Sequence, residues 1–233
     1  VIQQIIDHKP HYLIHLGDLF EADAASRWPS EYSFDLIDEY REGCRILKEL
    51  RMAGPRNMRC VFLPGNHDDN ILMGNRIPKK LRGLCDWRQP QMVGNKILNK
   101  ELLSKWNKPA DYVFCPKRGC WRLGQVVFAH GYKAGVNSDN QHAHRFCHDF
   151  GLYVGAHSHR PLPVTQAKIG GVGYVERWYA NAGCTREMGP EYAKRHDTTE
   201  WGQGCVVGEA DFDAGGKSPR RSRRWAAETR VFR

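Results

Sequence analysis

Polar residues that can bind metal or transfer protons occur in four short clusters, each directly after an apolar segment. The clusters are Gly17-Asp18, Gly65-Asn66-His67-Asp68, His130-Gly131 and His157-Ser158-His159. Carboxylate, amide oxygen and imidazole together suit a borderline divalent ion such as Mn²⁺, Zn²⁺ or Fe²⁺. A single histidine at a strand end is more often structural, but four clusters in order predict a metal site. The glycine beside each polar group permits a tight turn and leaves room for a ligand.

The elements that must position these clusters can be placed from hydrophobic periodicity. We expect helices over 1–8, 32–52, 96–106 and 141–150, and strands over 11–16, 59–63, 152–155, about 172–180 and 203–212. Residues 112–115 and 121–129 are predicted to pair as a hairpin around the turn between them. Each cluster then follows a strand end, where α/β folds collect catalytic groups.

The clusters resemble the motif blocks of the calcineurin-like metallophosphoesterase superfamily. Its pattern is Asp-x-His, Gly-Asp, Gly-Asn-His-Asp/Glu, His-Gly or a lone His, and Gly-His-x-His, and four of these five blocks match in order from Gly17 to His159. The last block here reads Gly-Ala-His-Ser-His, which keeps the spacing of the two histidines. The resemblance implies an α/β fold with a β-sandwich of two mixed sheets flanked by helices, in four layers α/β/β/α.

The same resemblance implies a role for each residue and two divalent metal ions, with Mn²⁺ preferred over Fe²⁺, Zn²⁺ or Ni²⁺. The implied metal ligands are Asp18, which bridges both ions, Asn66, His130 and His157 of the second site, and His159 of the first. His67 is implied as general acid or transition-state stabiliser above the phosphoryl group. Two cations about 3.5–4 Å apart can activate a bridging hydroxide for attack on phosphorus. Arg160, directly after the last histidine, is a candidate for binding a phosphate oxygen.

The Asp-x-His block has no counterpart in the chain. Only 16 residues precede Gly17, and Asp7-His8 is adjacent rather than alternating. We therefore expect that the chain begins inside the first helix and that the first strand is absent. The second metal site can then form, whereas the first keeps only Asp18 and His159.

Three classes of function fit these residues. The leading hypothesis is a phosphoesterase that hydrolyses a phosphodiester or phosphomonoester. A nuclease or phosphodiesterase is slightly favoured, because nuclease relatives share Gly-Asp-Leu-Phe and Gly-Asn-His-Asp. Lipid-precursor pyrophosphatases resemble Gly17–Glu21 but often carry Arg at the position of His67. The alternative is a catalytically degenerate scaffold that binds nucleic acid, against which the presence of His67 argues. A zinc-stabilised structural domain ranks third.

Composition bounds these hypotheses. The 233 residues, 41% of them hydrophobic, suit one large domain, which we place at 1–213, followed by a basic C-terminal tail or last strand at 214–233. That segment carries seven of the 35 basic residues against Glu228 alone, which we interpret first as a solvated end of the chain. The alternative is that it attracts a polyanionic partner such as nucleic acid, besides the phosphoester substrate. No apolar run reaches the roughly 18 residues of a membrane span, and no secretion signal is visible, so we expect a cytoplasmic protein with reduced thiols.

Several other polar residues have open roles. Asp68 either orients a neighbour or is a solvated loop acid. His144 and His148 share a helical face and are expected to be surface histidines. The Asn181-Ala182-Gly183 segment resembles the Asn-x-Gly stretch that closes the sheet near the site in this superfamily.

Overall fold

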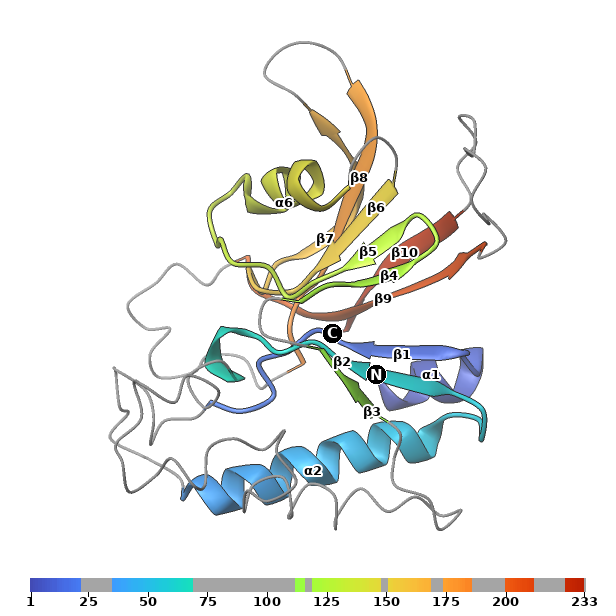
Figure 1. Cartoon of the computed structure of the whole chain (residues 1–233), viewed down its shortest axis with the longest axis vertical. Helices are drawn as coiled ribbons and strands as arrows, with labels where there is room; N and C mark the ends of the chain where they lie inside the picture. The colour runs from blue at the N-terminus through green and yellow to red at the C-terminus, as the bar shows by residue number, and fades with distance from the viewer. Residues whose placement is uncertain are drawn as a thin grey trace. The chain divides into compact units, whose positions relative to one another are not determined.

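The computed structural model describes residues 1–21, 35–68, 112–115, 119–147, 151–168, 174–185, 200–211 and 225–232. The chain divides into two compact units, Val1–Gly119 and Cys120–Arg233, and the described residues of each form both β-sheet and α-helix (Figure 1). The fold is therefore of the α/β class. In the part of the chain described, no helix is both long and apolar enough to span a membrane.

The first unit is built on a parallel three-stranded sheet. Its elements are α1 (Ile2–His8), β1 (Tyr12–His15), α2 (Leu36–Ala53), β2 (Arg59–Phe62) and β3 (Tyr112–Phe114), with strand order β1-β2-β3. α1 ends because Lys9 adopts a left-handed conformation and Pro10 follows it. The central strand β2 reads Arg-Cys-Val-Phe and is buried from Cys60 onward, as expected for a parallel strand covered on both faces.

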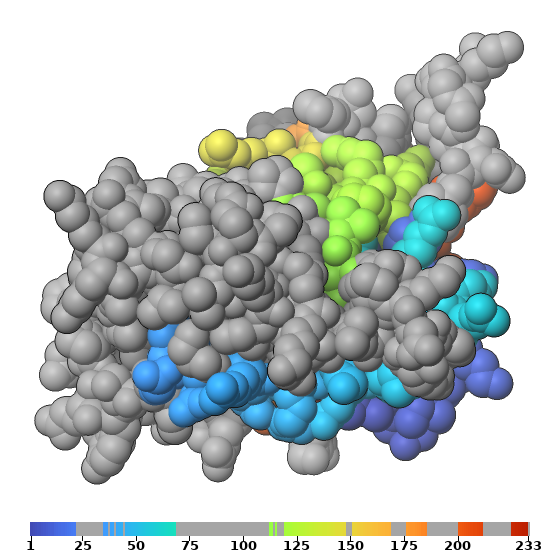
Figure 2. All heavy atoms as spheres, turned by 60° about the horizontal axis from the view of Figure 1, so that its bottom comes forward, coloured from blue at the N-terminus to red at the C-terminus, as the bar shows by residue number. Residues whose placement is uncertain are grey.

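Helix α2 is amphipathic. Leu47 on its inner side is fully buried, and its backbone carbonyl accepts a hydrogen bond from the Tyr112 hydroxyl at 2.8 Å. The opposite side faces solvent (Figure 2). There Arg45 pairs with Glu42 and Glu49, at spacings that bring side chains together on one helical face.

The second unit combines a mixed five-stranded sheet with an antiparallel pair. Its elements are β4 (Trp121–Leu123), β5 (Val126–Phe128), α6 (Ser138–Phe146), β6 (Gly151–Gly155), β7 (Pro161–Lys168), β8 (Tyr174–Ala182), β9 (Gln203–Ala210) and β10 (Trp225–Phe232). The order of the large sheet is β4-β5-β6-β8-β7, in which β5, β6 and β8 are parallel and the edge strands β4 and β7 are antiparallel to their neighbours. Pro161 begins edge strand β7, where its missing N–H does no harm.

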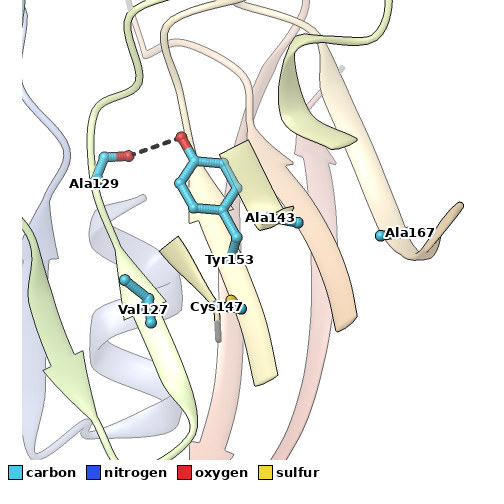
Figure 3. Close-up of a cluster of buried hydrophobic side chains, with 6 residues drawn as sticks. All are labelled: Val127, Ala129, Ala143, Cys147, Tyr153 and Ala167. Atoms are coloured by element: carbon cyan, nitrogen blue, oxygen red, sulfur yellow. Dashed lines mark hydrogen bonds between the residues drawn. The ribbon is translucent and has the colours of Figure 1, made fainter. Parts of the chain in front are cut away.

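The core of the second unit lies where α6 packs on the large sheet. Six buried side chains form it, namely Val127, Ala129, Ala143, Cys147, Tyr153 and Ala167 (Figure 3). The Tyr153 hydroxyl donates to the Ala129 carbonyl at 3.3 Å, so the one polar atom in this cluster is satisfied. Burial raises the pKa of the Cys147 thiol to about 11. None of the six described cysteines forms a disulfide, and Cys60 of the first unit is also almost fully buried.

Two of the sequence predictions about elements are wrong. Tyr112–Phe114 does not form a hairpin with residues 121–129 but pairs in parallel with β2. Residues 121–129 instead make their own hairpin, because Gly124 (φ 55) allows a tight turn between β4 and β5. The helix expected over 141–150 begins earlier, at Ser138, and ends at Phe146.

One strand was not predicted, namely β7, which follows the last histidine cluster directly. β10 lies in the basic segment, for which a last strand was one of the two alternatives. The Thr229 hydroxyl of β10 donates to the Leu162 carbonyl at 2.6 Å, which ties the two strands together. The helix expected over 96–106 lies outside the described residues, and the boundary at 213/214 stays a prediction.

Candidate functional site

In the first unit, the Gly17-Asp18 turn packs backbone to backbone against the turn that follows β2. Gly17 (φ 92) and Asp18 (φ 52) are both left-handed. A Cβ atom on Gly17 would lie 2.5 Å from the Leu63 carbonyl oxygen, and one on Gly65 would lie 2.6 Å from the Asp18 amide nitrogen. Because Gly17 and Gly65 have no side chains, the two turns can pack closely against each other. The sequence had instead predicted that these glycines leave room for a ligand. The contact brings two of the four clusters together.

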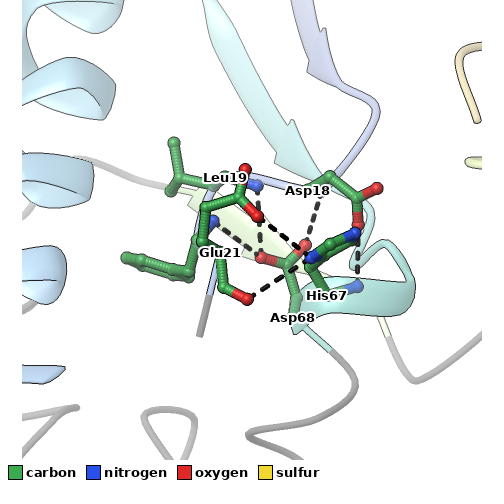
Figure 4. Close-up of polar contacts among 6 residues, drawn as sticks. Asp18, Leu19, Glu21, His67 and Asp68 are labelled. Atoms are coloured by element: carbon green, nitrogen blue, oxygen red, sulfur yellow. Dashed lines mark hydrogen bonds and ion pairs between the residues drawn. The ribbon is translucent and has the colours of Figure 1, made fainter. Parts of the chain in front are cut away.

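Asp68 holds these two turns in place (Figure 4). Its carboxylate is fully buried, and its Oδ2 accepts the backbone N–H groups of Asp18 at 2.7 Å and Gly65 at 2.8 Å. Oδ1 accepts the N–H groups of Leu19 at 3.2 Å and Phe20 at 3.3 Å. Asp68 is therefore an orienting residue, not a solvated loop acid, and four backbone donors compensate its buried charge.

Asp18 and His67 lie side by side at this junction. Asp18 Oδ1 accepts the His67 backbone N–H at 2.9 Å, which fixes the direction of the carboxylate. The His67 ring places Nδ1 3.3 Å from the Glu21 carbonyl oxygen and 3.4 Å from the Glu21 carboxylate (Figure 4). Two acceptors at Nδ1 favour the tautomer that carries its proton there. Sequence reasoning did not assign a role to Glu21. Asn66 is exposed.

In the second unit, His130 follows β5 and His157 follows β6, which are parallel neighbours. The His130 carbonyl accepts the N–H groups of Ala156 at 3.2 Å and His157 at 3.0 Å, so the two strand ends are bonded to each other. His130 Nε2 lies 3.1 Å from His157 Nδ1, and the rings meet edge to face at 70°. His130 is 5% exposed.

This pair of ring nitrogens fits a divalent cation. Two imidazole nitrogens bound to one ion at about 2.1 Å, at coordination angles of about 90–110°, are about 3.0–3.4 Å apart. The observed 3.1 Å lies in that interval. Among the metals that the sequence favours, imidazole nitrogen suits Fe²⁺, Zn²⁺ and Ni²⁺, whereas Mn²⁺ prefers oxygen ligands such as carboxylates.

The turn after His157 carries the two remaining candidates. His159 is left-handed (φ 58), its N–H donates to the Ala156 carbonyl at 2.8 Å, and its ring packs edge-on against Trp201 with 4.5 Å between centroids. Arg160 Nε lies 3.0 Å from Glu200 Oε2. A cavity of about 310 Å³ adjoins this pair, and its lining comprises Gly135, Val136, Asp139, Arg160, Pro161, Leu162 and Glu200.

Histidines of α6 have structural roles. The two ring nitrogens of His144 lie 3.2 Å from the Lys168 carbonyl oxygen and 2.9 Å from the Arg177 guanidinium. His142 is buried, and its Nε2 accepts the Tyr132 N–H at 3.2 Å. Burial, helped by the charges of Lys133 and Arg145, lowers the pKa of His142 to about 4. His148 lies outside the described residues.

Comparison with known proteins adds one finding. The family model described as calcineurin-like phosphoesterase matches residues 1–188, a range that contains all four clusters. No curated protein and no solved structure shows significant similarity to the chain.

Proposed function

Because the chain belongs to the calcineurin-like phosphoesterase family, we propose that it is a metal-dependent hydrolase of phosphoesters, with phosphodiesters favoured over phosphomonoesters. The observation that carries the proposal is the His130–His157 pair, whose nitrogens face each other at the separation of two ligands on one ion. The proposal extends to the fold, a β-sandwich of two mixed sheets flanked by helices in four layers, α/β/β/α, as the family resemblance implies.

The proposed metal ligands are the five residues that match the family's ligand positions. We assign His130, His157 and Asn66 to one ion, His159 to another, and Asp18 to both. A bound divalent cation supplies Lewis-acid polarisation of the phosphoryl group and lowers the pKa of its water. Mn²⁺ is the preferred metal. The family's motif order supports this ligand set, and the paired nitrogens support its central part.

His67 is proposed as the proton donor to the leaving oxygen. Its Nδ1 faces the Glu21 carbonyl and carboxylate, and these contacts hold the ring in one orientation. The His67 backbone also binds Asp18, so movement of the acid and of the proposed ligand is coupled. As the bond between phosphorus and the leaving oxygen breaks, that oxygen would take the proton from His67 and depart as an alcohol.

Arg160 is proposed to bind a phosphoryl oxygen of the substrate. It borders the cavity beside the turn that carries His157 and His159. The lining of the same cavity also contains Val136 and Leu162, which would offer apolar surface to the alcohol part of the ester. A charged group for the phosphoryl oxygens beside an apolar wall for the organic part suits a phosphoester better than inorganic phosphate.

Hydrolysis of two chromogenic esters tests this function. The purified protein is assayed with bis-p-nitrophenyl phosphate and p-nitrophenyl phosphate across Mn²⁺ concentrations. We expect metal-dependent turnover that falls about 10²–10⁴-fold in His67→Gln, the range of general acid catalysis, while Mn²⁺ binding persists. His130→Ala should lose Mn²⁺ binding as well. His11→Ala, which removes an exposed histidine of the same chain, is the control.

Two results would contradict the proposal. Turnover that survives in His130→Ala would show that the paired histidines are not the metal site. A folded protein without turnover under any divalent metal would favour the alternative, a scaffold that binds nucleic acid without catalysis. The ratio of the two substrates separates a diesterase from a monoesterase.

A further inference from the structure

We infer that Asp139 is a positioning residue that fixes the turn carrying His157 and His159 through hydrogen bonds to Ser158 and Asn181. This inference rests on the proposed metal-binding function. Asp139 lies in the first turn of α6, far along the chain from both histidines, and is only 4% exposed. It was not among the candidates chosen from the sequence.

The carboxylate of Asp139 joins three elements. Its Oδ2 accepts the Ser158 hydroxyl at 3.3 Å, and its Oδ1 accepts the Asn181 side-chain amide at 3.0 Å. Ser158 is the residue between the two histidines, and Asn181 lies in β8, where it pairs with Gly155 at the end of β6. A single buried carboxylate thus connects α6, the histidine turn and the sheet.

Asn181 makes this connection rigid. It is fully buried, and its Oδ1 accepts the Gly183 N–H at 2.8 Å, so its amide group can point in one direction only. Its Nδ2 donates to Asp139 and also lies 3.0 Å from the Ser158 hydroxyl oxygen. The Ser158 hydroxyl therefore accepts from Asn181 and donates to Asp139, which uses its single proton and fixes its rotamer.

The cost of this arrangement points to a role beyond packing. Burial of a carboxylate against neutral donors is unfavourable, and it raises the pKa of Asp139. Well-packed apolar residues would fill the same volume without that penalty. The turn it holds is also strained, because His159 adopts a left-handed backbone that non-glycine residues seldom occupy. Strained turns at functional sites persist when surrounding contacts over-determine them, as Asp139 does here.

The position of the two histidines depends on this turn. The His157 ring must keep its Nδ1 near His130 Nε2, and the Asp139 carboxylate holds the side-chain hydroxyl of the next residue, Ser158. Partners that orient metal ligands typically account for about 10–100-fold in metal affinity. Asp139 should contribute in that range without touching metal or substrate.

Mn²⁺ affinity tests the inference independently of catalysis. Binding is measured from the electron paramagnetic resonance signal of free Mn²⁺ during titration of wild type, Asp139→Ala, Asp139→Asn and Ser158→Ala. Glu209→Gln removes an exposed carboxylate of the same unit and is the control. We expect the dissociation constant to rise about 10–100-fold in Asp139→Ala and Ser158→Ala, less in Asp139→Asn, and not in Glu209→Gln.

The urea midpoint of each variant separates positioning from folding. A purely structural role would lower the midpoint and leave the Mn²⁺ affinity of the folded protein within twofold of wild type, which would overturn the inference. Because Ser158→Ala removes only one hydroxyl, it decides the question even if Asp139→Ala fails to fold. When Asp139→Ala and Ser158→Ala are combined, their effects on the Mn²⁺ dissociation constant should not add, since both residues act through one contact.

Mn²⁺ binding and ester hydrolysis by the wild-type protein distinguish failure of the proposed function from failure of this inference. A wild-type protein that binds Mn²⁺ but hydrolyses neither ester contradicts the catalytic proposal, and the affinity comparison still decides the role of Asp139. A wild-type protein that binds no Mn²⁺ overturns both.

Discussion

Substitution of Asp68 by asparagine should loosen the two turns that support Asp18 and His67. Each carboxylate oxygen accepts two backbone N–H groups, Oδ2 those of Asp18 and Gly65, and Oδ1 those of Leu19 and Phe20. Asparagine has the same shape but only one oxygen. Whichever way its amide turns, the NH₂ group faces two N–H donors and cannot accept from either.

The expected loss of stability follows from those two donors. A buried group left without its partner costs about 1–3 kcal/mol, so two such groups cost about 2–6 kcal/mol. Some relaxation of the partly exposed Asp18 turn should keep the loss near the lower half of that range. Even about 2 kcal/mol is a large share of the roughly 5–15 kcal/mol that stabilises a folded protein.

Hydrogen exchange of the affected amides is the direct assay. We expect the amides of residues 18–20 and 65 to exchange at least about 30-fold faster in Asp68→Asn, the factor that 2 kcal/mol represents, with a lower urea midpoint. Glu42→Gln, which removes an exposed carboxylate paired with Arg45 on α2, should change stability by less than about 1 kcal/mol. Unchanged protection of these amides in Asp68→Asn would refute the assignment of Asp68 as the support of both turns.

Three further predictions follow. In urea unfolding, Gly17→Ala should destabilise the first unit by at least about 1 kcal/mol, because φ is +92° and the new Cβ would lie 2.5 Å from the Leu63 carbonyl oxygen. Gly135→Ala is the control and should leave stability unchanged, because no other atom lies within 4 Å of its new Cβ. The folded-state pKa of His142, about 4, lies below its usual 6.5, so its contribution to stability is complete above pH 6.5 and is lost as pH falls towards 4. Urea unfolding of metal-free protein between pH 7 and 4.5 should therefore show a smaller loss in His142→Gln than in wild type, and equal losses would contradict this assignment. Glu200→Gln should lower KM for bis-p-nitrophenyl phosphate by up to about fivefold, since it releases the partly buried Arg160 from its ion pair with the exposed Glu200. An unchanged or higher KM would argue against substrate binding by Arg160.

The sequence predicted the elements whose pattern is local. β1, β2 and β6 are short apolar runs that end at glycine or at a Pro-Gly pair, and the structure has them at the expected places. Helix α1 also ends where Lys9-Pro10 predicted. The clusters after these strands could be found because strand, turn and polar residue are adjacent in the sequence.

Pairing partners and buried carboxylates could not be found in this way. β3 resembles the first arm of a hairpin, but its partner is β2, more than 40 residues earlier, and strand pairing at that distance leaves no local signal. Asp68 and Asp139 look like ordinary loop and helix acids until the donors that surround them are known. For Asp139 the available signal was weak: an acid in the first turn of a helix usually interacts with the helix dipole.

The buried cysteines give each unit its own reporter of opening. Cys60 is 1% exposed in β2 of the first unit, Cys147 is fully buried at the end of α6 in the second, and Cys120 is exposed. A thiol reagent can reach Cys60 or Cys147 only after local or global unfolding, and the raised pKa of Cys147 slows its reaction further. Mass spectrometry of alkylated peptides would then give separate opening free energies for the two units from one sample, with Cys120 as the internal measure of reagent activity.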